Sequence, residues 1–203
     1  MKHKLLSSGL ILIITLFFTS CASTKLINPW RDSSFEGPIK KVFVVAAVRT
    51  RGPRILIENE FIQQLKARGT GAVGSAEFLV DDAPPTRETL EPRVRESGSD
   101  ALLVLRFVKK ETVETYTPAK GKGVPVTFDT NAWSSFQFPE TSEQEVTYDF
   151  NLIVMQLTLY EVSTGKPVWS STSETRYQGD GLEKIKPFAR VVMTRLISEG
   201  LIK

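Results

Sequence analysis

Cysteine and histidine are almost absent from this chain of 203 residues, which contains one of each. A single cysteine excludes a disulfide-stapled scaffold, and 41% hydrophobic with 24% charged residues excludes a disordered or collagen-like chain. The only histidine, His3, belongs to an N-terminal leader, so the mature protein has none. Most side-chain catalysis near neutral pH therefore has no obvious agent. We expect no catalytic residue, no metal site and no cofactor.

A marked charge imbalance is also lacking once the leader is removed. The whole chain has 26 basic and 23 acidic residues, a formal charge of +3. Lys2 and Lys4 lie within the first 20 residues and every acid lies after them, which leaves 24 bases against 23 acids, or +1. A net charge this close to zero gives no electrostatic basis for binding nucleic acid.

Residues 1–20 form a leader with a basic start and a short apolar run over residues 9–18. A helix needs about 20 apolar residues to span a bilayer, so this shorter run predicts a secretory signal peptide. The residues that close it, Phe18-Thr19-Ser20-Cys21, resemble the lipobox of bacterial lipoproteins, with Phe18 in place of the usual leucine.

The lipobox resemblance implies that Cys21 is acylated, with palmitate or a related chain, and is the first residue of the mature protein. No aspartate follows Cys21, which in that family implies the outer membrane, with the protein facing the periplasm. Several acyl chains, at about 0.8 kcal/mol per buried methylene, make such an anchor effectively permanent. The alternative is an ordinary cleaved signal peptide that leaves Cys21 as a free thiol.

The rest of the chain predicts an acylated tether, residues 21–40, and then a single α/β domain, residues 41–203, of the α+β type with a mixed sheet. Two continuous apolar runs, 41–48 and 101–105, are typical of strands buried on both faces, and we expect them to lie parallel at the sheet centre. A hairpin of residues 146–162 and 167–177 should pair antiparallel beside them. The expected order is β-α-β-α-β-β-β-α, with helices packed on the sheet.

Residues 118–144 form a long insertion with three prolines and two glycines. The flanking half-strands, 106–117 and 145–153, lose the doubly buried pattern, and we expect them to pair as a ribbon that projects beyond the domain. Four large rings within the insertion are candidate partner contacts: Phe128, Trp133, Phe136 and Phe138. Large apolar rings in a loop are unfavourable when exposed to water, so these four either fold back on the domain or contact a partner or a membrane.

Three arginines surround the predicted start of the first helix and form a candidate anion contact: Arg49, Arg51 and Arg54. Guanidinium groups near free helix N–H groups can hold a carboxylate or phosphate, although a solvated loop is the alternative. Residues 69–74 match G-x-G-x-x-G, but a dinucleotide site needs a strand before the motif, and here a helix precedes it. We expect Glu58 to face away from the apolar side of that helix.

A series of strand and turn signals covers most of residues 28–200: segments 28–32, 41–48, 66–69, 96–104 and 160–169. Together they resemble a group of small bacterial outer-membrane lipoproteins whose domain has no assigned function. The same plan is more distantly similar to penicillin-binding-protein activator lipoproteins and to the N-terminal domain of the Tol-Pal translocation protein. Those relatives bind other envelope proteins, which implies a binding role here.

The residues and the resemblance together predict a non-catalytic lipoprotein that binds an envelope protein as an adaptor. Two alternatives stay open. One is a histidine-free hydrolase of cell-wall or lipid substrates, and the other is a structural envelope component without a single partner. A deep cleft with convergent acids would favour the hydrolase.

Overall fold

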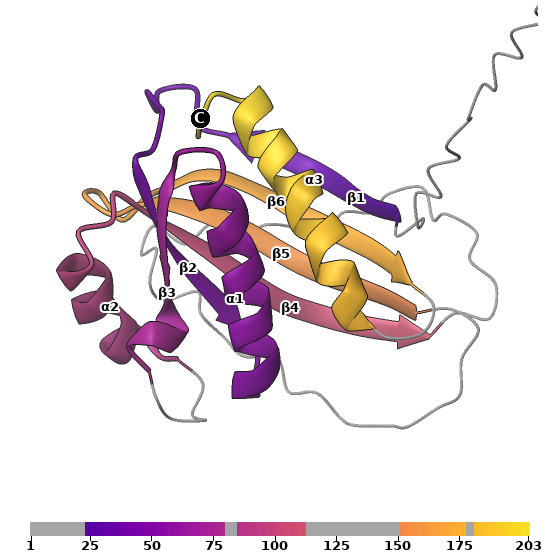
Figure 1. Cartoon of the computed structure of the whole chain (residues 1–203). Coiled ribbons are helices and arrows are strands. Elements are labelled where there is room, and N and C mark those ends of the chain that lie inside the picture. The colour runs from indigo at the N-terminus through magenta and orange to yellow at the C-terminus, as the bar shows by residue number, and fades with distance from the viewer. Residues whose placement is uncertain (1–22, 80–84, 113–150, 178–180) are drawn as a thin grey trace, which may run out of the picture.

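A computed structural model describes residues 23–79, 85–112, 151–177 and 181–203 of the protein. Six strands form one mixed sheet in the order β1-β6-β5-β4-β2-β3 (Figure 1). The strands are β1 (Ser23–Arg31), β2 (Lys41–Ala47), β3 (Gly71–Gly74), β4 (Ala101–Thr112), β5 (Asn151–Glu161) and β6 (Pro167–Tyr177). The helices are α1 (Arg51–Lys66), α2 (Arg87–Glu96) and α3 (Ile185–Ser198), with short 3₁₀ helices η1 (Ser75–Glu77) and η2 (Gly181–Lys184). These elements confirm the predicted α+β class.

β2 and β4 confirm the prediction of two neighbouring parallel strands. Val42 pairs with Ala101 and Ala47 with Arg106 in parallel register. Every β2 residue from Val42 to Ala47 is at most 2% exposed, because helices cover both faces of the sheet at this strand. β5 and β6 form the predicted antiparallel hairpin, and β5 also pairs antiparallel with β4.

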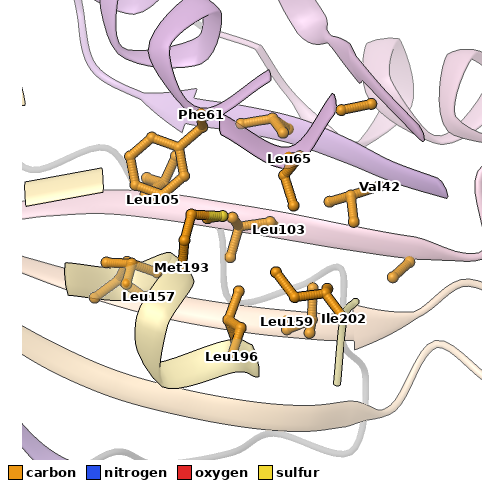
Figure 2. Close-up of a cluster of buried hydrophobic side chains, with 14 of the residues drawn as sticks. Val42, Phe61, Leu65, Leu103, Leu105, Leu157, Leu159, Met193, Leu196 and Ile202 are labelled. Atoms are coloured by element: carbon orange, nitrogen blue, oxygen red, sulfur yellow. The ribbon is translucent and has the colours of Figure 1, made fainter. Parts of the chain in front are cut away.

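Helices α1 and α3 cover one face of the sheet, and α2 covers part of the other (Figure 1). Alternate β2 side chains enter different clusters: Val44 and Ala46 pack under α1 and α3, whereas Phe43 and Val45 pack under α2. Figure 2 shows the larger cluster, where Phe61, Leu65, Met193 and Leu196 of the helices meet Leu103, Leu105, Leu157 and Leu159 of the sheet. The alternation of β2 therefore divides the core between two helical layers.

The segment predicted to be a tether contains a strand. Ser23–Arg31 forms β1, which pairs antiparallel with β6 at the edge of the sheet, and Thr24 Oγ1 lies 2.9 Å from Thr175 Oγ1. The ladder is irregular between Ile27 and Trp30, the stretch that contains Pro29. An edge strand tolerates proline at such a bulge, because one side of the strand needs no hydrogen-bond donor. The tether prediction is therefore wrong for Ser23–Arg31.

The apolar phase of β5 changes after Ile153, and the neighbouring strand supplies the reason. β4 carries an extra residue here, since Phe107 pairs with Met155 and Lys109 pairs with Val154. The polar continuation predicted for β4 reaches Thr112, which pairs with Asn151. The rest of the predicted ribbon, residues 113–150, lies outside the described residues.

Glycines end α1 and α3. Gly69 has φ 80° and Gly200 has φ 69°, left-handed values that glycine adopts without a steric penalty. After each glycine the chain closes back on the helix: the Thr70 N–H donates to the Leu65 carbonyl (3.1 Å) and the Leu201 N–H donates to the Leu196 carbonyl (3.0 Å). This is the Schellman motif, and it provides hydrogen-bond donors for carbonyl groups at the helix end that have none within the helix.

Candidate functional site

The carboxyl ends of β2 and β3 lie next to each other and next to α1. β2 leads into α1 on one face, and β3 leads through η1 to α2 on the opposite face. The predicted arginine contact is attached here, because Arg49 and Arg51 follow β2 directly.

The side chain of Glu58 extends from α1 to these strand ends. Glu58 is 0% exposed, and its carboxylate accepts three hydrogen bonds. The Ala46 N–H at the end of β2 donates to Oε1 (3.0 Å), and so does the Ser75 hydroxyl just after β3 (2.6 Å). The Ala76 N–H donates to Oε2 (2.9 Å). Glu58 thereby joins α1 to the ends of both strands and occupies donors that could otherwise hold an external anion.

Arg54 lies one helical turn before Glu58 and is also 0% exposed. Burial raises the pKa of Glu58 above its ordinary value of 4.5, while the three hydrogen bonds and the charge of Arg54 act in the opposite direction. The charge of Arg54 has the smallest of these effects, so the hydrogen bonds are the main stabilising contacts of the Glu58 carboxylate.

The three arginines predicted as one anion contact do not share a surface. Arg54 is buried, Arg51 is half-buried and Arg49 is exposed. The prediction is wrong for Arg54, because its side chain is 0% exposed and therefore closed off from solvent. For Arg49 and Arg51 the anion contact stays a prediction.

Gly74, the last residue of β3, leaves the space that Glu58 occupies. A Cβ atom at this position would lie 2.8 Å from Glu58 Oε2 and 2.9 Å from Ile62 Cδ1, closer than packed atoms tolerate. At Gly71 a Cβ atom would lie 3.3 Å from the Lys40 carbonyl oxygen. Close packing therefore explains Gly71 and Gly74, and the end of α1 explains Gly69.

Sequence analysis missed Glu58 because its polarity assigned it to the solvent side of α1. Its spacing gives the opposite indication: Glu58 follows Arg54 by four residues and precedes Phe61 by three, which places all three on one helix face. The signal that could have found the site is an oppositely charged i, i+4 pair inside an apolar stripe. Such a pair indicates buried polar contacts, since a buried charge needs partners.

The raised pKa of Glu58 predicts an unusual pH dependence of stability. A carboxyl whose pKa is higher in the folded chain than in the unfolded chain takes up a proton more readily when folded. The stability that Glu58 contributes is fully present below pH 4.5, and it is lost as the pH rises through the pKa of the folded state. Glu58→Gln lacks this titration, so the difference in unfolding free energy, native minus variant, should grow as the pH falls from neutral toward 4.5. Urea unfolding of both proteins at several pH values measures it, and a constant or shrinking difference would contradict the prediction.

The other predicted site residues cannot be placed. Cys21 and the four rings Phe128, Trp133, Phe136 and Phe138 lie outside the described residues. Within the described ranges, no three His, Cys, Asp or Glu side chains gather so that they could hold a metal ion. In the same ranges, no helix has the length and apolar character needed to cross a membrane.

The chain matches no protein-family model and no curated protein. Among solved structures it is similar to PelC of Paraburkholderia phytofirmans, a dodecamer seen in two crystal forms, at 14% identity and a TM-score of 0.47. The two matches cover 86% and 89% of this chain and 98% and 100% of PelC. It is also similar to lipoprotein GNA1162 of Neisseria meningitidis at 12% identity and a TM-score of 0.43, over 78% of this chain and 98% of that one. At these values the likeness carries no argument about activity or partners, and the distant similarity to penicillin-binding-protein activators and the Tol-Pal protein stays a prediction.

Proposed function

We propose that the protein is a lipoprotein held in the outer membrane by acylated Cys21, faces the periplasm, and acts as a non-catalytic adaptor that binds another envelope protein. The observation that supports binding over catalysis is the environment of the Glu58 carboxylate. Its two oxygens are buried and accept hydrogen bonds from Ala46, Ser75 and Ala76 of the chain itself.

The hydrolase alternative requires acids that converge on an accessible point. Glu58 is the only fully buried carboxylate within the ranges that the structure describes, and it lies beside the positive charge of Arg54. A carboxylate sealed among three donors has no open position for a substrate. The site therefore supports a structural role for Glu58 and favours binding as the function of the domain.

The partner contact proposed for the insertion can be tested in cells. A photo-crosslinking amino acid at Trp133 or Phe136 should give a discrete crosslinked product, whereas the same group at Thr164, exposed in the turn between β5 and β6, should not. Replacing residues 120–138 with a short Gly-Ser turn removes both positions, and it should leave the melting temperature nearly unchanged. If the rings are core instead, that variant should melt several degrees lower, because a buried ring contributes roughly 1.5–3 kcal/mol. A melting temperature that falls, or the lack of a discrete product from both Trp133 and Phe136, would reject the contact.

A further inference from the structure

β1 begins so soon after Cys21 that an anchor on this residue leaves almost no tether. Cys21 and Ser23 are two residues apart, so their Cα atoms are separated by at most about 7 Å whatever the conformation. The headgroup layer on each side of a bilayer is about 5–8 Å thick. With its acyl chains in the hydrocarbon, Cys21 therefore holds the start of β1 at the surface of the headgroups.

Ser23 is part of the sheet, so its position constrains the whole domain. It pairs with Arg176 of β6, and the pairing continues without a break to Ile27. The Thr24 and Thr175 hydroxyls lie 2.9 Å apart next to it, and α3 contacts β1 from one face. A paired strand under a helix cannot swing as a flexible linker does.

The register defines which end of the sheet would meet the membrane. Ser23 is level with Arg176 of β6, Leu152 of β5 and Glu111 of β4. This end carries the amino ends of β1 and β5 and the carboxyl ends of β4 and β6 (Figure 1). The opposite end carries the turn over residues 162–166, roughly 30 Å away along strands that rise about 3.3 Å per residue.

We propose that the domain stands end-on on the membrane, with the Ser23 end of the sheet against phospholipid headgroups and the turn over residues 162–166 directed away. The inference rests on the lipid anchor proposed above and adds the orientation of the domain. Exposed Lys25 and Lys110 lie within two positions of the Ser23 row, where their ammonium groups can meet headgroup phosphates.

Quenching of a fluorophore by headgroup-labelled lipid tests this orientation. The full acylated chain, with Lys110→Cys or Thr164→Cys as an added labelling site, is placed in vesicles of phosphatidylethanolamine and phosphatidylglycerol that contain a headgroup spin label. Both positions are exposed, and they lie near opposite ends of the sheet. We expect quenching at position 110 to be several-fold stronger than at position 164. Equal quenching, or stronger quenching at position 164, would overturn the proposal.

Two controls separate the orientation from the anchor itself. An insertion of about 15 Gly and Ser residues between Ala22 and Ser23 gives a linker with an r.m.s. span of about 20 Å, and it should remove the difference between the two positions. If the difference persists with this linker, the short connection between Cys21 and β1 is not its cause, and the proposal is wrong. Mass spectrometry and flotation with the vesicles report the anchor separately. Acylated protein that floats but shows equal quenching leaves the proposed function standing, whereas protein without lipid that does not float overturns both.

Discussion

Cys21→Ser should abolish acylation and leave a precursor that keeps its leader and is absent from the outer membrane. The thioether that carries the lipid forms at sulfur, and a thiolate is the nucleophile that serine cannot supply. Cys21 is the only thiol in the chain, so no other residue can replace it. The expected result is complete loss, not a partial decrease, and membrane fractionation with immunoblotting measures both the size and the location of the product.

Ser20→Ala is the matched control for this prediction. It changes the neighbouring residue but keeps a small side chain before the thiol, and its product should match the native protein in size and location. A Cys21→Ser protein that is processed to mature size and stays in the outer membrane would show that the anchor lies elsewhere.

Glu58→Ala should destabilise the domain by about 3–5 kcal/mol, since each buried donor left without an acceptor costs about 1–3 kcal/mol. The variant leaves the Ala46 N–H, the Ala76 N–H and the Ser75 hydroxyl without the carboxylate that accepts their hydrogen bonds. Such a loss is a large part of the 5–15 kcal/mol that stabilises an ordinary domain. Urea unfolding at neutral pH measures it.

Glu60→Ala is the matched control on the same helix. Glu60 is half-buried and accepts one side-chain hydrogen bond, from Gln64 Nε2 (2.7 Å), so its loss should cost only about 0.5–1.5 kcal/mol. The double variant Glu58→Ala and Arg54→Met tests the charge interaction between the two residues. It should lose less stability than the two single variants summed, by about 0.5–3 kcal/mol. Additive losses would contradict the coupling of Arg54 to Glu58.

The sequence predicted the centre of the fold better than its edge, for a physical reason. β2 and β4 are covered by helices on both faces, so nearly every residue must be apolar and the run is visible in the sequence. β1 is half-exposed at the edge, pairs on one side only and contains Pro29. An edge strand with a bulge lacks both the continuous apolar run and the clean alternation by which strands are recognised.

The sequence indicated where the three arginines lie along the chain, but it did not indicate that Arg54 is buried. The arginines after β2 do lie at the strand ends, because the chain passes directly from β2 into α1. Arg54 is buried, and the position of Glu58 one turn later depends on the space left by Gly74, which is distant in sequence. Contacts of that kind arise from the packing of α1 on β3, so a local pattern of charges does not reveal them.

The acylated N-terminus is the central claim, and mass spectrometry of the mature protein purified from the membrane fraction tests it most directly. The account predicts that the N-terminal peptide begins at Cys21 and carries the added mass of its acyl chains, with no peptide that spans Ser20 and Cys21. An unmodified peptide that crosses this bond as the major species would contradict the anchor, and with it the end-on orientation of the domain.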